Sequence, residues 1–289
     1  MVLENGFIRA EINAKGAELS SLKRIQEGYE YLWGADPAYW AKTSPVLFPI
    51  VGALKDNRYY YDDEKYQMLR HGFARDHFFE GSQLSDNEAV FVLKDTEETR
   101  IQYPFAFQLS LKYAVRDYSL RCTYEVHNPS KDSSLLFSIG GHPAFAVGGS
   151  ERNPLYEDHY LEFPDDEELR CHVIDQNLIS DRTEVIALNR HRLPLKHDLF
   201  DHDALVLKTL KSQTITLGNR VDNHGIHFRH EGFSYFGIWA AKDADFVCLE
   251  PWCGIADSIH HNQRLEDKEG IQYLEARGTW TRSWEVACF

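Results

Sequence analysis

Residues 107–127, which read FQLSLKYAVRDYSLRCTYEVH, alternate between apolar and polar side chains in two successive runs. In the first run, apolar residues at positions 107, 109, 111, 113 and 115 are separated mostly by polar ones. The same period of two resumes after the polar pair Arg116-Asp117. This period is typical of a strand with one buried face, and a polar pair between two such runs is typical of a hairpin turn. We therefore predict two long antiparallel strands here.

Shorter apolar runs of the same kind occur on both sides of this hairpin. Turn-forming residues, such as those at 128–130 and 148–150, separate several of them. Helical patterns are few and short; the clearest is a single turn at residues 36–40, with Asp36 as the cap and Pro37 at the first position. Many short strands with hardly any helix predict an all-β fold, a large sandwich or a barrel. No linker-like stretch divides residues 1–289, so one domain is expected. The shorter runs are residues 7–12, 89–93, 205–207, 214–217, 226–228 and 246–249.

The charge balance restricts the partners of this chain. It carries 45 acidic and 31 basic side chains, a formal net charge of −14, which disfavours binding to nucleic acid or to an anionic membrane. Residues 1–6 lack the charged start and apolar run of a signal peptide, and no apolar run is long enough to span a bilayer, so a cytoplasmic location is expected. The five cysteines include no CxxC pair and are expected to be free structural thiols.

Residues 135–145 place a histidine after a strand. Residues 135–139 predict the strand, and Gly140-Gly141 allows a tight or positive-φ path before His142, which Pro143 stiffens. A histidine in such a position suits acid–base chemistry near neutral pH, because its charge changes there. A structural hydrogen bond is an equally reasonable interpretation of this segment alone.

Residues 246–252 predict a strand with a carboxylate at its end. Glu250 follows four apolar residues directly, and partial burial there would raise its pKa and make it a better base near pH 7. A solvated or ion-paired glutamate is the commoner outcome for such a residue taken alone.

Residues 44–52 and 70–76 form the third dense stretch. His71 and Arg75 flank Gly72 and could direct two donors toward one ligand, with an arginine suited to forked hydrogen bonding. The alternative is an arginine that pairs with Asp76 or another acid. The chain has no HExxH, CxxC or calcium-loop pattern and no nucleotide-binding or serine-hydrolase motif, so neither a metal nor an organic cofactor is expected.

Taken together and in order, these segments resemble the aldose 1-epimerase superfamily, which includes the galactose mutarotases. The form of the motifs is most similar to the LacX-like branch, and the resemblance extends over essentially the whole chain. The motifs that carry it are Phe48-Pro49-Ile50-Val51-Gly52, His71-Gly72-Phe73-Ala74-Arg75, Gly141-His142-Pro143, Asp203-Ala204 and Glu250-Pro251-Trp252.

This resemblance implies a fold and a set of residue roles. The fold is a large antiparallel β-sandwich of the galactose mutarotase kind, with the site in a cleft on one sheet. His142 is the implied acid and Glu250 the implied base, while His71 and Arg75 bind the sugar. The sugar-binding aspartate falls on Asp203, which matches this branch, or on Asp201.

The chain departs from the family pattern at one position. Mutarotases usually carry an arginine soon after the glycine of the first motif, whereas Gly52 is followed here by Ala53-Leu54-Lys55. Lys55 and Arg58 are the nearest bases that could take its place, although a lysine lacks the two-pronged geometry of an arginine.

The implied reaction interconverts the α and β anomers of a hexose or hexose 6-phosphate without a cofactor. Glu250 takes the proton of the C1 hydroxyl, His142 protonates the ring oxygen, and the roles reverse after rotation about C1–C2. Two other functions remain open: a non-catalytic sugar-binding protein of the same fold, and a glycoside hydrolase, whose chemistry normally requires two carboxylates. The oligomeric state is left open.

Overall fold

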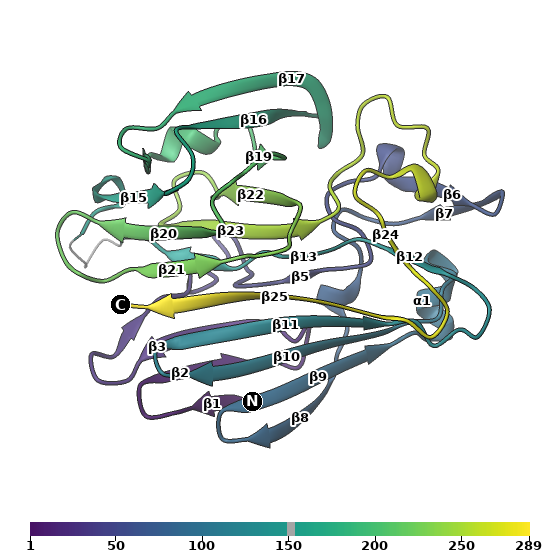
Figure 1. Ribbon diagram of the computed structural model, residues 1–289, viewed down its shortest axis with the longest axis horizontal. Helices are drawn as coiled ribbons and strands as arrows, with labels where there is room; N and C mark the ends of the chain where they lie inside the picture. The colour runs from purple at the N-terminus through teal and green to yellow at the C-terminus, as the bar shows by residue number, and fades with distance from the viewer. Residues whose placement is uncertain (149–153) are drawn as a thin grey trace.

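Two large antiparallel sheets dominate the computed structural model, which describes residues 1–148 and 154–289 (Figure 1). Most of the expected turn at residues 148–150 therefore lies outside the described residues. In this part of the chain, one sheet has nine strands in the order β18-β15-β20-β21-β25-β11-β10-β9-β8. Its strands are β8 (Glu80–Ser85), β9 (Glu88–Lys94), β10 (Gln108–Arg116), β11 (Ser119–His127), β15 (His159–Glu162), β18 (Arg192–Pro194), β20 (Thr214–Asn219), β21 (Ile226–Arg229) and β25 (Thr279–Cys288).

The second large sheet has eight strands among the described residues, in the order β17-β16-β19-β22-β23-β13-β5, with β14 paired to β23. Its strands are β5 (Val46–Leu47), β13 (Ile139–Gly141), β14 (Ala144–Ala146), β16 (Glu168–Asp175), β17 (Leu178–Ala187), β19 (Leu205–Leu207), β22 (Tyr235–Trp239) and β23 (Phe246–Cys253). This sheet contributes most of the strands around the site described below.

Smaller elements complete the fold, and one of them, a four-stranded sheet, contacts β10 of the nine-stranded sheet. A four-stranded sheet is built from β1 (Val2–Glu4), β2 (Ile8–Ile12), β3 (Leu19–Arg24) and β4 (Tyr29–Glu30), and two strand pairs from β6 (Arg58–Tyr61) with β7 (Glu64–Gln67) and β12 (Leu135–Phe137) with β24 (Gln272–Leu274). The helical segments are α1 (Glu97–Gln102) and the 3₁₀ turns η1 (Lys55–Asn57), η2 (Ala74–Asp76), η3 (Tyr156–Asp158), η4 (His197–Phe200) and η5 (Leu265–Asp267). No helix among the described residues is both long and apolar enough to cross a membrane.

The hairpin predicted at residues 107–127 is confirmed as β10 and β11. The two strands pair from Gln108–His127 to Arg116–Ser119, and their alternating apolar side chains are buried. Contacts between the large sheets close the core: Phe228 of β21 lies against Phe236 of β22, with ring centroids 6.1 Å apart. The predicted all-β sandwich is therefore confirmed, because the inner faces of two antiparallel sheets pack on each other.

Three local predictions differ from the structure. Residues 135–139 form two strands rather than one, because the N–H of Ser138 donates to the carbonyl of Pro49 (2.7 Å) and β12 and β13 pair with different neighbours. Residues 36–40 form a hydrogen-bonded turn and not a helix, although the carboxylate of Asp36 accepts from the N–H of Ala38 (2.9 Å) as a cap would. Helix α1 was not singled out, and it begins with a capping box between Thr96 and Thr99.

Candidate active site

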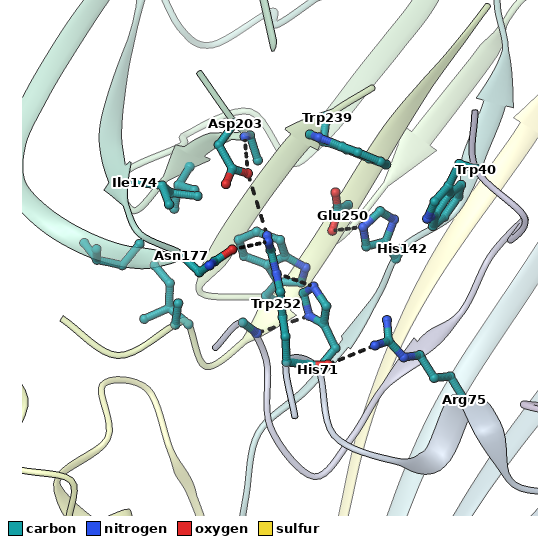
Figure 2. A pocket seen from close by; sticks show the side chains of 17 residues that line it. Trp40, His71, Arg75, His142, Ile174, Asn177, Asp203, Trp239, Glu250 and Trp252 are labelled. Carbon is teal, nitrogen blue, oxygen red and sulfur yellow. Dashed lines mark hydrogen bonds and ion pairs between the residues drawn. The ribbon is translucent and has the colours of Figure 1, made fainter. Parts of the chain in front are cut away.

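A cavity of about 340 Å³ opens on the eight-stranded sheet. Its walls come from β16, β17, β19, β22 and β23, and from the segments that follow β4, β5, β7, β13, η4 and β23. Figure 2 shows the labelled side chains of Trp40, His142, Trp239 and Glu250 gathered on one part of this cavity and those of Asn177 and Asp203 on another. A concave site of this size, with aromatic walls and a few polar groups, suits a small-molecule ligand.

His142 and Glu250 meet in the wall of this cavity. Nε2 of His142 lies 3.1 Å from Oε2 of Glu250, and both residues are buried. Glu250 belongs to the central strand β23, whereas His142 follows the last residue of β13, which pairs with β23. The sheet itself therefore brings two residues from distant parts of the sequence together.

Gly140 and Gly141 permit this approach for a steric reason. The expectation of a positive-φ path is wrong, since neither glycine has a positive φ. A Cβ on Gly140 would instead lie 2.5 Å from Cδ1 of Trp252, and one on Gly141 would lie 2.7 Å from Oη of Tyr124. The glycines are needed here because other side chains fill the space that a Cβ would occupy.

Burial sets the protonation of the pair. It lowers the pKa of His142 to about 3 and raises the pKa of Glu250 well above its ordinary value, because a charged form loses its hydration inside the protein. Both shifts favour the uncharged form of each side chain. Trp40 and Trp239 pack on the imidazole, with ring centroids 4.9 and 5.7 Å away.

His71 is held at the cavity by an unusual backbone. Its φ is 71° and that of Gly72 is 70°, and a Cβ on Gly72 would lie 2.3 Å from the carbonyl oxygen of Phe48. The N–H groups of Phe73 and Ala74 donate to the same carbonyl. These contacts fasten the second motif to the first, and such strained conformations concentrate at functional sites.

Two donors compete for the imidazole of His71. The backbone N–H of Gly52 donates to Nδ1 (3.2 Å), and Nε of Arg70 donates to Nε2 (3.1 Å). Burial, followed by the positive charge of Arg70, holds the pKa of His71 well below its ordinary value, so the ring is neutral. A neutral imidazole has only one acceptor nitrogen, so it cannot satisfy both donors at once.

Arg70 extends from His71 to the opposite wall of the cavity. Its Nη1 donates to Oδ1 of Asn177 (3.0 Å), in the turn between β16 and β17, and its Nη2 lies 3.7 Å from Oδ1 of Asp203. Arg75 also lines the cavity, and its Nη2 donates to the carbonyl of Arg70 (2.9 Å). Arg75 also pairs with Asp76, as the sequence allowed, with Nε 3.8 Å from Oδ2, so Arg70 is the guanidinium that lies near the carboxylate of Asp203.

Comparison with known proteins adds to this geometry. The family model described as aldose 1-epimerase matches residues 1–269. The chain belongs to the aldose 1-epimerase family. It is 31% identical over 297 residues to the plasmid-encoded and chromosomal LacX proteins of Lactococcus lactis subsp. lactis, covering 98% of this chain and 97% of each relative.

Solved structures from this family have the same fold. A galactose mutarotase related enzyme from Lactobacillus acidophilus is similar with a TM-score of 0.94 and 29% identity, covering 100% of this chain and 97% of that one. A galactose mutarotase-like protein from Lactobacillus casei gives a TM-score of 0.91 and 29% identity, covering 100% and 99%. The similarity to the LacX proteins assigns the chain to the LacX-like branch of the epimerase superfamily.

The cavity contains most of the side chains that the sequence singled out. His142, Glu250, His71, Arg75 and Asp203 all line it, whereas Asp201, the alternative to Asp203, does not. Whether they bind or convert a sugar stays a prediction.

Lys55 is placed outside this cavity. Its backbone N–H donates to Asp257 (2.9 Å) and its Nζ to the carbonyls of Ile259 (2.8 Å) and His261 (3.4 Å). The alternative base, Arg58, pairs with Asp56 on the surface. Neither side chain faces the site in place of the usual family arginine.

Several cavity residues were given no role by the sequence, among them Arg70, Asn177, Trp40 and Trp239. Arg70 precedes His71 in the sequence, but nothing there shows which way the side chain of Arg70 points. Asn177 lies in a hairpin turn, and the pairing of β16 with β17 is needed to bring that turn to the cavity.

Proposed function

We propose that this protein is an aldose 1-epimerase that interconverts the α and β anomers of a hexose or hexose 6-phosphate. The observation that carries the proposal is the 3.1 Å contact between Nε2 of His142 and Oε2 of Glu250 in the wall of a tryptophan-lined cavity. Membership of the aldose 1-epimerase family supports it.

The His142–Glu250 pair can supply one proton and accept one, as anomerisation requires. Ring opening removes one proton from the C1 hydroxyl and adds one to the ring oxygen, so the number of protons on the enzyme does not change. Burial favours the uncharged pair, and transfer of its proton from Oε2 to Nε2 gives an imidazolium acid and a carboxylate base. His142 then protonates the ring oxygen while Glu250 takes the hydroxyl proton, and closure on the other face reverses both steps.

The remaining polar side chains orient the sugar. Because Gly52 already donates to Nδ1 of His71, the neutral ring carries its proton on Nε2 when Arg70 is not donating there. We propose that Nε2–H donates to a sugar oxygen, and that Arg70 turns fully toward Asn177 and Asp203. The indole faces of Trp40, Trp239 and Trp252 supply apolar surface for the C–H groups of the ring.

The charges of the cavity accommodate a neutral or a phosphorylated sugar. Arg70 and Arg75 line the cavity, whereas Lys55 and Arg58 do not. Each guanidinium has an aspartate nearby, Asp203 for Arg70 and Asp76 for Arg75, so an anionic substituent would have to take the place of one of these pairings.

Polarimetry tests the proposal directly. The optical rotation of freshly dissolved α-D-glucose and α-D-galactose, and then of their 6-phosphates, is followed with wild type, His142→Asn and Glu250→Gln. Wild type is expected to accelerate the approach to equilibrium, and each variant to lose on the order of 100- to 10,000-fold of that rate. A folded wild type that accelerates none of these sugars, yet binds one of them calorimetrically, would indicate a sugar-binding protein instead.

A further inference from the structure

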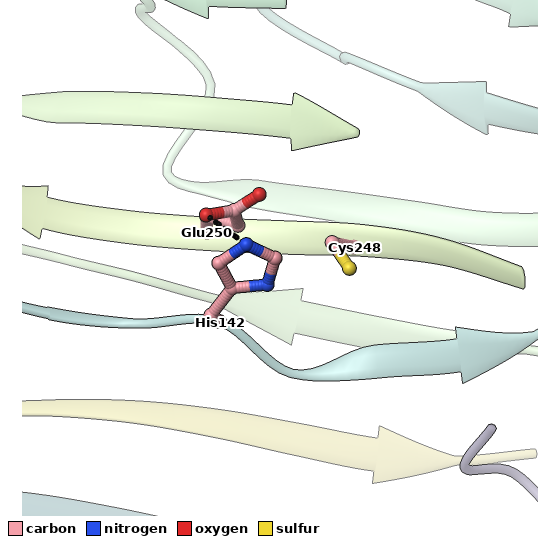
Figure 3. A group of neighbouring side chains, drawn as sticks. All are labelled: His142, Cys248 and Glu250. Atoms are coloured by element: carbon pink, nitrogen blue, oxygen red, sulfur yellow. Dashed lines mark ion pairs between the residues drawn. The ribbon is translucent and has the colours of Figure 1, made fainter. Parts of the chain in front are cut away.

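Cys248 lies beside the acid–base pair and has no part in the proposed chemistry. Side chains alternate along β23, so Phe246, Cys248, Glu250 and Trp252 share one face. Glu250 and Trp252 line the cavity, and Cys248 lies one step further along the same face, fully buried. Figure 3 shows the side chains of Cys248 and Glu250 on this strand, beside the imidazole of His142.

These three side chains form a compact set of donors. A ring nitrogen of His142, Sγ of Cys248 and a carboxylate oxygen of Glu250 all lie within 4.8 Å of one another, and all three residues are buried. Tetrahedral zinc has bonds of roughly 2.0 to 2.3 Å to such atoms, which puts neighbouring donors roughly 3.3 to 3.7 Å apart. The 3.1 Å contact between His142 and Glu250 is already near this spacing, so a shift of the thiol of about 1 Å would complete three corners of a tetrahedron.

The charge balance favours a divalent ion at this position. Bound to a metal ion, the three ligands are a thiolate, a carboxylate and a neutral imidazole. Their combined charge of about −2 equals the charge of a divalent cation with the opposite sign, so a buried ion would be compensated by its own ligands.

We propose that His142, Cys248 and Glu250 form an inhibitory site for a thiophilic divalent cation of the Zn²⁺ type, whose fourth position faces the cavity. The ion replaces the proton that the acid–base pair needs, so it stops turnover and is not a cofactor. Binding of the ion is independent of the proposed function, while inhibition rests on it. The sequence shows no metal motif because the ligands come from two distant segments.

Cobalt substitution tests the ion binding without any activity assay. Co²⁺ added to the purified, reduced protein is expected to give a thiolate-to-cobalt charge-transfer absorption, which Zn²⁺ then abolishes. Cys248→Ser and Cys248→Ala should lose this absorption. Cys253→Ala is the matched control, because Cys253 lies on the opposite face of the same strand and its Sγ contacts the carbonyl of Gly232 instead; it should keep the absorption.

The outcomes separate binding from inhibition. No absorption in wild type, or an absorption that survives in folded Cys248→Ala, would overturn the site. If wild type is an epimerase, Zn²⁺ should inhibit it, and Cys248→Ala should raise the inhibitory concentration at least about tenfold while keeping its uninhibited rate. Inhibition of equal strength in wild type and Cys248→Ala would also refute the proposal. A cobalt absorption in a protein without epimerase activity would leave the ion site standing and refute the proposed function alone.

Discussion

His142 and Glu250 titrate as one unit, because neither side chain can gain or lose a proton without changing its neighbour 3.1 Å away. Their burial favours the uncharged forms, and in the proposed mechanism the acid that protonates a ring oxygen comes from a single shared proton. The acidity of the site is therefore set by the environment of the pair and not by histidine chemistry alone.

The acid limb of the pH profile is expected to lie well below the ordinary histidine pKa of roughly 6.5. Burial lowers the pKa of His142 to about 3, so the His142–Glu250 pair should not take up a further proton as the pH falls through 6.5. The measurement is kcat/KM by polarimetry between pH 4 and 8, with circular dichroism at each pH to check folding. A half-maximal rate near pH 6.5 in a folded protein would show instead that the imidazole titrates freely.

Arg70→Met is expected to raise KM about tenfold, with a smaller change in kcat. The guanidinium contacts Asn177 and lies near Asp203 at the cavity, and loss of one charged hydrogen bond costs about 1.5 kcal/mol. Arg58→Met is the matched control, because Arg58 pairs with Asp56 outside the cavity and its loss should leave KM unchanged. An equal effect of both variants would argue against a sugar contact by Arg70.

At the scale of residues, the sequence predicts which residues belong to the site better than it predicts where their side chains point. His142 and Glu250 were found because their motifs end strands, which fixes where their side chains project. Lys55 was placed wrongly because nothing near it in the sequence shows that Asp257 and the carbonyls of Ile259 and His261 hold it. Arg70 was missed because its direction depends on partners more than 100 residues away.

At the scale of elements, the packing of the motif at residues 71–75 against the motif at residues 48–52 depends on Gly72. The chain passes through a left-handed conformation there, and the carbonyl of Phe48 fills the position that a side chain would take. The loop that presents His71 can therefore form only if one residue lacks a Cβ.

Gly72→Ala is expected to lower the free energy of unfolding by about 2 kcal/mol or more, through left-handed strain and the clash with Phe48. Gly28→Ala separates the two causes, because Gly28 has a similar φ of +65° but no atom within 4 Å of the added Cβ. Urea denaturation of both variants measures the difference. Equal destabilisation would mean that the contact with Phe48 contributes nothing.

The strand break at Ser138 shows why element boundaries were harder to predict than elements. Residues 135–139 carry an unbroken apolar pattern, so period alone extends one strand through them. The break follows from a hydrogen bond to Pro49, which lies in another part of the sequence. The long hairpin at 107–127 was predicted well because its two strands pair with each other and its turn lies between them.

At the scale of the whole molecule, buried histidines couple the stability of the sandwich to acid. His230 is 2% exposed, with its ring 4.4 Å from that of Phe236, and burial lowers its pKa to about 4. An unfolded chain binds a proton at this residue below pH 6.5, whereas the folded chain does so only near pH 4. The free energy of unfolding should therefore fall as the pH drops through this window.

His230→Leu is expected to remove up to about 3 kcal/mol of this acid sensitivity between pH 6.5 and 4. The measurement is the free energy of unfolding in urea at pH 7.5 and at pH 4.5. His227→Leu is the control, because it removes an exposed histidine from β21, the strand that ends just before His230. A wild-type slope that persists in His230→Leu would assign the acid sensitivity to other groups.

The alternation of β23 limits how this protein can change during evolution. Glu250 and Trp252 reach the cavity because they share a face with Cys248 and Phe246, and this strand pairs with both β22 and β13. A substitution leaves the alternation of side chains between the two faces unchanged. The gain or loss of one residue within residues 246–253 would instead turn the carboxylate of Glu250 away from His142 and bring the other face of the strand toward the cavity. Length changes should therefore be confined to the loops, and this strand should keep a fixed length while its residues diverge.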